Sequence, residues 1–220
     1  MYMIIVGAGS IGTSLIDISV GEKNNVVVVD ANADRARDIS TKYDITVLSG
    51  DATSAETLRE AGSERADAVI VTTSDDAVNL MVVSIAAELR IPAIVSVVND
   101  GEHAGFFRTL GAHVMENPED VVAHHLYNAV KRPNVRDFAM LTQGTQIFRL
   151  QISESSPLID RSVEEAIARE ILPECVRVVA IEREGEPTMA IDDLTILSED
   201  VLTLFALERV SDELVEKLSG

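Results

Sequence analysis

Three glycines near the start of the chain have the spacing of a phosphate-binding loop. Gly7, Gly9 and Gly12 form the pattern G-x-G-x-x-G between the apolar run YMIIV and a stretch of helical character. In such a loop the first glycine permits a tight turn, the second lets a diphosphate approach the backbone, and the third allows close packing of helix on strand. The pattern therefore predicts that a nucleotide diphosphate binds at the N-terminus of the following helix, although a merely tight strand-to-helix connection would use the same glycines.

A carboxylate stands where ribose recognition needs one. Asp30 closes the second apolar run, NVVVVD. A carboxylate there accepts both hydroxyls of an adenosine ribose and repels a 2′-phosphate, which favours NAD or another adenine nucleotide over NADP. The alternative is that Asp30 caps the next helix through the segment DANAD. Because the glycines and the acid occur together, the ligand role is the favoured interpretation.

Two further loops are expected at the same edge of the sheet. The segment GDAT follows the third apolar run, and TTSDD follows the fourth. The hydroxyls of Thr72 and Thr73 can reach a ribose or a phosphate. Ser74 or Asp75 can equally cap the next helix, and Asp51 can be an ordinary turn acid. The two loops are therefore candidate ligand contacts with structural alternatives.

The apolar runs that carry these loops alternate with helical stretches in the first part of the chain. The runs are apolar throughout, as in parallel strands that are covered on both faces. Strand–helix–strand units with short links predict a Rossmann-like, doubly wound parallel α/β sheet, in which ligands bind beyond the carboxyl ends of the strands. The predicted strands are residues 2–6, 25–30, 45–50, 67–73, 93–98 and 112–116.

The pattern changes at the segment KRPNVRD. Pro133 cannot continue a helix and the local charge turns basic, so a hinge is predicted at residues 131–136 between domains 1–130 and 137–220. Beyond it, TQIFRLQIS, VRVVAIERE and VLTLFALER have the pattern of strands, and SVEEAIARE that of a short capped helix. Ser211 is expected to cap a final helix. These features predict a small α+β C-terminal domain.

Composition sets further limits on function. The 220 residues include 37 acidic and 18 basic side chains, for a net charge of −19. Such a surface repels nucleic acid and anionic lipid, so no nucleic-acid partner is expected. No apolar run approaches the roughly 20 residues that span a bilayer, and the start lacks signal-peptide features, which predicts a cytoplasmic location. A single cysteine, Cys175, excludes an internal disulfide and a multi-cysteine zinc site.

Groups for catalysis are not recognisable in the sequence. A dehydrogenase with this loop needs a substrate domain and a proton donor near the nicotinamide, and neither is identified. No metal site is predicted, and three pairs of neighbouring acids are expected on solvated turns: Asp75–Asp76, Asp192–Asp193 and Glu199–Asp200. The sequence therefore favours a ligand sensor over an enzyme, with a small NAD-dependent oxidoreductase and a scaffold with a vestigial pocket as alternatives.

In this order and spacing, the segments IIVGAGSIG, VVVVD, GDAT and TTSDDAVNL resemble the RCK domain, also called KTN, which regulates potassium channels and transporters. The later segments FRLQISESSPLIDRSVEEA and VRVVAIEREGEPTMAIDDLTILSEDVLTLFA resemble the C-terminal lobe of that family. The likeness extends over nearly the whole chain and is to the TrkA-type cytosolic subunits of Trk potassium-uptake systems.

The resemblance implies a regulatory subunit at the inner face of the cell membrane. A nucleotide, NAD(H) or else ADP or ATP, would bind in the Rossmann-like lobe and change the geometry of a homodimer. Dimers would assemble into a tetramer or ring under an integral-membrane potassium transporter subunit. The alternative is an RCK subunit of a potassium channel that is gated by another ligand. By motif matching, the implied binding residues are Gly7, Gly9, Ser10, Ile11 and Gly12 for phosphate, Asp30 for ribose, Asp51 and Ala52 on the adenine side, and Thr72 and Thr73 on the phosphate side.

The resemblance also implies a dimer surface and shows two departures from the family pattern. The helix NPEDVVAHHLYNAV and the exposed-looking Phe106, Phe107 and Leu110 are the implied dimer surface. Several relatives carry an arginine in the glycine loop or on strand five, where this chain has Ser10 and Ser96. Without that cation a triphosphate would be poorly neutralised, which favours NAD(H) or a diphosphate over ATP.

Overall fold

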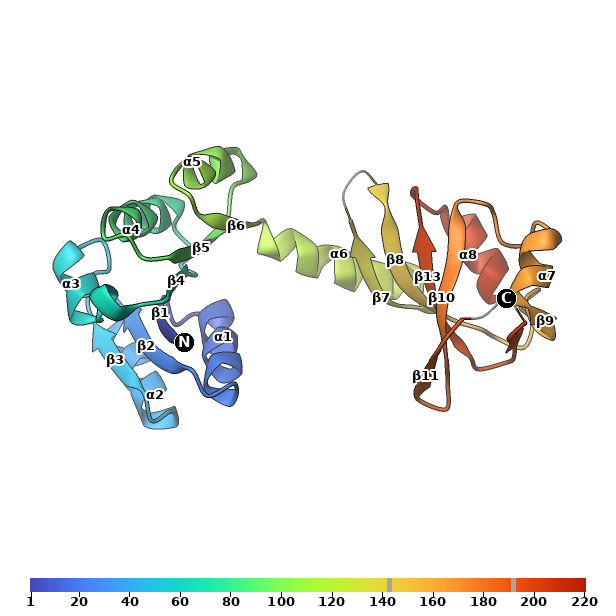
Figure 1. The fold of residues 1–220 in the computed structure, drawn as a ribbon, viewed down its shortest axis with the longest axis horizontal. Coiled ribbons are helices and arrows are strands. Elements are labelled where there is room, and N and C mark those ends of the chain that lie inside the picture. The colour runs from blue at the N-terminus through green and yellow to red at the C-terminus, as the bar shows by residue number, and fades with distance from the viewer. Residues whose placement is uncertain (142–143, 191–192) are drawn as a thin grey trace. The chain divides into compact units, whose positions relative to one another are not determined.

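The computed structural model describes residues 1–141, 144–190 and 193–220 (Figure 1). The chain divides into two compact units, Met1–Val121 and Val122–Gly220, each with its own hydrophobic core. No helix in the described part of the chain combines the length and apolar character needed to cross a bilayer.

The N-terminal unit is built on a six-stranded parallel sheet. The strand order is β3-β2-β1-β4-β5-β6, and neighbouring strands pair in parallel. The chain proceeds from the central β1 to the edge at β3, then returns to the centre at β4 and proceeds to the other edge at β6. The predicted Rossmann-like sheet is confirmed. The strands are β1 (Tyr2–Val6), β2 (Asn25–Asp30), β3 (Thr46–Ser49), β4 (Ala68–Val71), β5 (Ala93–Val98) and β6 (His113–Glu116).

Helices cover both faces of this sheet, because successive strand residues point to opposite sides. On β1, Ile4 packs in the cluster that includes Val82 and Phe107, whereas Ile5 packs in the cluster that includes Ile16. β1 thus contributes to two apolar layers, as its uninterrupted hydrophobicity predicts. The helices are α1 (Ser10–Gly21), α2 (Ala33–Lys42), α3 (Ala55–Glu60), α4 (Asp76–Glu88) and α5 (Ala104–Thr109), with short 3₁₀ turns at Ser63–Arg65 and Gly101–His103.

Helix α6 (Pro118–Lys131) begins at a proline and carries the division between the two units. Beyond the division, Val122, Leu126 and Val130 are exposed. Their spacing of four residues places them on one side of the helix. This apolar stripe lies on the helix that the family resemblance implied as a dimer surface, and that role remains a prediction.

The other predicted dimer residues behave differently from one another. Phe106 on α5 is 62% exposed, whereas Phe107 is fully buried in the core. The expectation that Phe107 is exposed is wrong, since neighbouring helix residues point about 100° apart and cannot share a face. Leu110 is partly buried.

The described residues of the C-terminal unit form an antiparallel sheet of order β11-β10-β13-β8-β7 and a small β12-β9 pair. One face of the sheet and the helices share a core that includes Phe148, Leu204 and Val215. The predicted α+β domain is confirmed, and Ser211 Oγ accepts a hydrogen bond from Leu214 N, as expected of a cap. The elements are β7 (Val135–Met140), β8 (Gln146–Gln151), β9 (Arg161–Ser162), α7 (Val163–Ala168), β10 (Val176–Arg183), β11 (Glu186–Met189), β12 (Thr195–Ile196), β13 (Val201–Ala206) and α8 (Asp212–Ser219).

The segment 131–136, predicted as a hinge, has defined contacts within the C-terminal unit. Arg132 Nε donates to Asp212 Oδ1 at 2.6 Å, at the first residue of α8. Val135 and Arg136 already belong to β7, a strand that the sequence did not predict because few of its side chains are apolar and buried. The location of a hinge and the domain boundaries remain predictions.

An ion pair between a buried aspartate and a partly exposed arginine lies directly before β13. Asp200 accepts from Arg183 through both oxygens, with Nε–Oδ1 and Nη2–Oδ2 distances of 2.8 Å, and its Oδ2 also accepts from Leu197 N. The expectation of a solvated Glu199–Asp200 pair is therefore wrong for Asp200. Asp192 lies outside the described residues.

Candidate functional site

The glycine loop joins β1 to α1 and is hydrogen-bonded by Thr72, the residue that follows β4. Gly7 has φ +95°, a left-handed conformation that strains other residues. Thr72 Oγ1 donates to the carbonyl oxygens of Gly7 and Val6 at 3.0 and 3.2 Å. The Thr72 hydroxyl, predicted as a ligand contact, thus holds the loop in place.

The other two glycines of the motif have distinct roles. A Cβ on Gly12 would lie 1.9 Å from the carbonyl oxygen of Gly7, so only glycine lets α1 approach the loop this closely. A Cβ on Gly9 would have no heavy atom within 4 Å. Gly12 therefore serves packing, whereas the space beside Gly9 is open to a ligand.

Asp30 is held against the glycine loop by backbone groups. Its carboxylate is 3% exposed, Oδ2 accepts from Ala8 N at 2.7 Å, and Oδ1 accepts from Asn32 N at 2.7 Å. The suggested helix cap is not Asp30 but Asn32, whose Oδ1 accepts from Asp34 N and Arg35 N. The two sequence signals, the glycines and the acid, are thus joined by a direct hydrogen bond.

Arg35 is a site residue that sequence reasoning missed. It lies in the first turn of α2, and its Nη2 and Nε are 3.2 and 3.3 Å from Asp30 Oδ1. The sequence prediction looked for a cation at the positions of Ser10 and Ser96. The available signal was DANADR, in which Arg35 follows the cap Asn32 by three residues and so points back toward the end of β2.

The turn after β3 presents an ionised acid. Asp51 Oδ1 accepts from Thr53 Oγ1 at 2.7 Å and from Thr53 N at 2.8 Å. These two bonds hold the pKa of Asp51 below its usual 3.8. Asp51 is therefore a turn acid, as the alternative interpretation proposed, because its Oδ1 atom bonds within the turn. The residue also lines the cleft described next.

The loops after β1 to β4 border one cleft of about 480 Å³. This volume lies within the roughly 300–1,000 Å³ of small-molecule sites. Of the predicted binding residues, Gly12 lies outside the lining. The others all line it: Gly7, Gly9, Ser10, Ile11, Asp30, Asp51, Ala52, Thr72 and Thr73. Arg35 and Glu119 are among the further lining residues.

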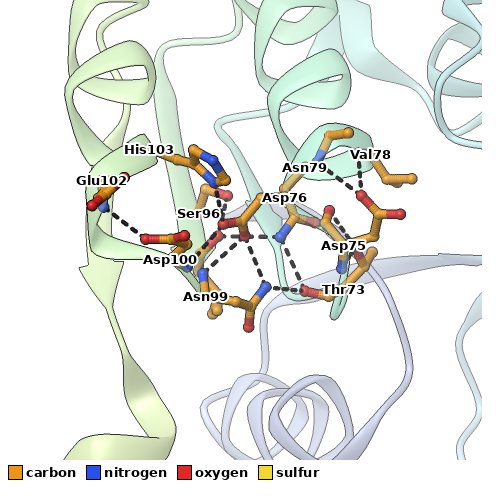
Figure 2. A network of polar contacts seen from close by, with 12 residues as sticks. Thr73, Asp75, Asp76, Val78, Asn79, Ser96, Asn99, Asp100, Glu102 and His103 are labelled. Atoms are coloured by element: carbon orange, nitrogen blue, oxygen red, sulfur yellow. Dashed lines mark hydrogen bonds and ion pairs between the residues drawn. The ribbon is translucent and has the colours of Figure 1, made fainter.

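The loop after β4 is fixed by a polar network that reaches β5 (Figure 2). Asp75 caps α4 by accepting from Ala77 N at 2.8 Å, as one of the sequence alternatives proposed. Asn79 Nδ2 donates to the carbonyl oxygens of Thr73 and Val97 at 3.0 and 3.2 Å. The backbone at Thr73 is therefore positioned by a buried side chain of α4.

Asp76 extends the same network to the segment after β5 (Figure 2). Its carboxylate accepts from Asn99 N at 2.8 Å, from Asp100 N at 2.9 Å and from His103 Nδ1 at 2.9 Å. Partial burial opposes ionisation of Asp76, but these bonds hold its pKa below 3.8, and the bond to Asp76 raises the pKa of His103 above 6.5. Asp76, expected on a solvated turn, is instead an anchor between two loops.

Comparison with known protein families identifies both units. The TrkA-N domain model matches residues 3–118, and the TrkA-C domain model matches residues 147–219. The chain belongs to the TrkA family. The family resemblance given by the sequence is therefore confirmed.

Curated TrkA proteins match the chain over most of its length. The Trk system potassium uptake protein TrkA of Halomonas elongata is 30% identical over 217 residues, which is 95% of this chain and 47% of that protein. The TrkA protein of Vibrio alginolyticus is 30% identical over 85% of this chain and 42% of its own length. The chain thus spans about half of these two relatives. It spans 92% of the Pyrococcus horikoshii TrkA homolog, at 27% identity.

Solved structures share the fold of this TrkA chain. The GsuK channel bound to NAD aligns over 100% of this chain and 39% of its own, with a TM-score of 0.66 and 21% identity. The TrkA-N domain of the inner membrane protein ybaL from Escherichia coli aligns over 57% of this chain and 94% of its own, with a TM-score of 0.53 and 18% identity.

Proposed function

We propose that this chain is a nucleotide-sensing regulatory subunit of a membrane potassium transporter. The observation that carries the proposal is the buried Asp30 carboxylate, bonded to Ala8 N of the glycine loop at the wall of the cleft. The names of the curated relatives support a role in potassium uptake. GsuK structures described as bound to NAD and to ADP support an adenine nucleotide as ligand.

The lining of the cleft fits a dinucleotide or a nucleoside diphosphate. The N–H groups of Ser10 and Ile11, in the first turn of α1, have no partner within the helix and can receive phosphate oxygens. Asp30 would accept from the ribose, and the turn at Asp51 and Ala52 would border the adenine. Among the described lining residues, Arg35 is the one cation, and it lies beside Asp30. This arrangement favours NAD(H) or ADP over ATP.

The proposed mode of action is binding without chemical conversion. Asp30 and Asp51 are fixed as hydrogen-bond acceptors, and the Thr72 hydroxyl is committed to the glycine loop. A ligand between the glycine loop and the loop at Thr73 would bias the protein between two conformations only through a difference in affinity for them. We propose that the exposed α6 stripe of Val122, Leu126 and Val130 contacts a second copy of the chain in a homodimer or ring. This assembly would lie at the inner face of the membrane.

Calorimetric titration of the full chain with NADH, NAD⁺, ADP and ATP tests the ligand. Asp30→Asn preserves an acceptor for Ala8 N but removes the charge, and we expect it to weaken NADH or ADP binding at least tenfold. Asp38→Asn, at an exposed acid of the same α2, is the matched control and should bind as the wild type does. Absence of binding by all four nucleotides, or equal binding by Asp30→Asn, would contradict the proposal.

The regulatory part needs a separate measurement. We expect solution scattering of the protein to differ between the nucleotide-free and NADH-saturated states, with no oxidation of NADH during the experiment. Identical assembly geometry in both states would remove the sensing role. Turnover of NADH with a carbonyl substrate would instead support the oxidoreductase alternative.

A further inference from the structure

The ribose acid of the cleft is already supplied with donors. Asp30 Oδ1 accepts from Asn32 N at 2.7 Å and from Nη2 and Nε of Arg35 at 3.2 and 3.3 Å. A carboxylate oxygen has about two lone-pair sites. Three N–H groups therefore saturate Oδ1, and Ala8 N takes one site of Oδ2. Asp30 cannot receive two ribose hydroxyls while all four donors remain.

Arg35 is the donor that can leave. Ala8 N and Asn32 N belong to the backbone of the glycine loop and of the turn before α2, so their positions are fixed by the fold. The Arg35 side chain is 55% exposed and lines the cleft. Both of its contacts are long and go to one oxygen, a geometry weaker than two parallel N–H···O bonds.

Arg35 also has N–H groups to spare. A guanidinium carries five donors, and two of its nitrogens are engaged with Asp30. Its planar fork is suited to phosphate as well as carboxylate. A phosphate on the ribose could therefore pair with Arg35 while Arg35 remains bonded to Asp30. The two hydroxyls of an unphosphorylated ribose must instead compete with Arg35 for the Asp30 oxygens.

We propose, on the basis of the adenine-nucleotide function above, that Arg35 sets the selectivity of the cleft at the 2′ position of the adenosine ribose. Displacement of Arg35 opposes binding of an unphosphorylated ribose. The retained guanidinium neutralises a 2′-phosphate that the Asp30 carboxylate alone would repel. Arg35 thereby reduces the preference for NADH over NADPH that an aspartate at this position otherwise imposes.

The test is the ratio of two dissociation constants, NADPH over NADH, measured by calorimetry on the full chain. We expect Arg35→Met to raise this ratio at least tenfold, through weaker NADPH binding together with unchanged or tighter NADH binding. Arg35→Lys keeps the charge without the fork and should raise it less. Arg37→Met is the matched control, because Arg37 lies on the same helix, is exposed and pairs with Asp34. It should leave the ratio unchanged.

The outcomes separate this inference from the proposed function. If wild-type protein binds NADH and Arg35→Met leaves the ratio unchanged, the inference is wrong and the nucleotide function stands. Equal weakening of both ligands would also overturn it, since Arg35 would then only position Asp30. If wild-type protein binds neither NADH nor NADPH, the inference fails, and the nucleotide function fails with it only if ADP and ATP do not bind either. An unchanged melting temperature of Arg35→Met shows that a shift in ratio does not come from unfolding.

Discussion

Each unit of the chain buries an aspartate beside an arginine, and the two pairs differ in what holds the carboxylate. Asp200 has both oxygens on the Arg183 guanidinium, at 2.8 Å each, so the arginine itself fixes the acid. Asp30 has its two oxygens on the backbone N–H groups of Ala8 and Asn32, and its arginine is an additional, longer contact on one oxygen.

The comparison shows that the donors bound to a buried carboxylate decide whether the carboxylate can exchange its arginine for another partner. Arg183 cannot leave Asp200 without uncovering an acid whose side chain is fully buried, so that pair serves the stability of the C-terminal unit. Asp30 keeps a backbone donor on each oxygen when its arginine moves, whereas Asp200 would keep only Leu197 N, on Oδ2. The same two side-chain types thus form a pair that stabilises the C-terminal unit, Asp200 with Arg183, and a pair in the N-terminal unit, Asp30 with Arg35, whose arginine can be displaced.

The largest expected effect is a loss of stability in the N-terminal unit that leaves the stability of the C-terminal unit unchanged. Gly12→Ala places a Cβ against the carbonyl of Gly7 and should lower the free energy of unfolding of the N-terminal unit by about 3 kcal/mol or more. Hydrogen exchange read separately for each unit measures this, with protection of β8 and β13 preserved. Gly9→Ala is the control, since its Cβ has open space. Equal loss from both alanines would show that the close approach of Gly12 is unimportant.

The second prediction addresses the fixed pair. Asp200→Ala removes the acceptor of Arg183 and of Leu197 N, and should cost about 3 kcal/mol of stability in the C-terminal unit. Nucleotide affinity should be unchanged, because Asp200 does not line the cleft. Urea unfolding and calorimetry on the same variant give the two readouts. A loss of affinity without a loss of stability would break the comparison.

The third prediction is the counterpart at the replaceable contact. Asp30→Ala leaves the buried N–H group of Ala8 and the part-buried N–H group of Asn32 without their acceptor, which should cost about 2 kcal/mol. Asp30→Ala removes arginine contacts of 3.2 and 3.3 Å, whereas Asp200→Ala removes two of 2.8 Å, so the loss should be smaller than that of Asp200→Ala. Nucleotide binding should be lost. The same two measurements apply, and a larger stability loss here than at Asp200 would reverse the assignment of roles.

The smallest expected effect concerns pH and the N-terminal network. The pKa of His103 is raised by Asp76 and by the nearby Asp100 and Glu102. Its contribution to stability is therefore complete below pH 6.5, the ordinary histidine pKa, and is lost as pH rises through the higher pKa of the folded state. Asp76 has a lowered pKa, so its contribution persists above 3.8 and disappears only in stronger acid.

Melting temperatures recorded upward from pH 6.5 check this. His103→Gln should abolish a small decline that the wild type shows over that range. The control is His113→Gln, at an exposed histidine of β6, which should retain the decline. A decline that persists in His103→Gln would assign it to another group.

Local pattern was sufficient for the parallel sheet and most of the cleft. Uniformly apolar strands, the spacing of Gly7, Gly9 and Gly12, and Asp30 at a strand end each encode their geometry within a few residues. The partners of individual side chains were not predictable in this way. The Thr72 hydroxyl faces the glycine loop because β4 pairs with β1, a contact between distant segments.

The other misses have the same origin. Asp200 is buried because Arg183, on a neighbouring strand, reaches it across the sheet. β7 pairs with β8 through its backbone, and its side chains are mostly exposed, with the polar Arg136 and Asp137 next to each other, so they give no apolar alternation to recognise. Arg35 was within reach of sequence reasoning, because its distance from the cap Asn32 is short.

The bond from Thr72 to Gly7 has a consequence for biosynthesis. The two residues are 65 positions apart, so a nascent chain that has released only β1, α1 and β2 carries the glycines and Asp30 without the clasp that shapes the loop. Loop closure over that distance must precede a competent phosphate cradle. A nucleotide that binds as proposed would therefore bind, and stabilise by mass action, molecules in which β4 has already paired with β1, so its binding would also report that this part of the N-terminal sheet has formed.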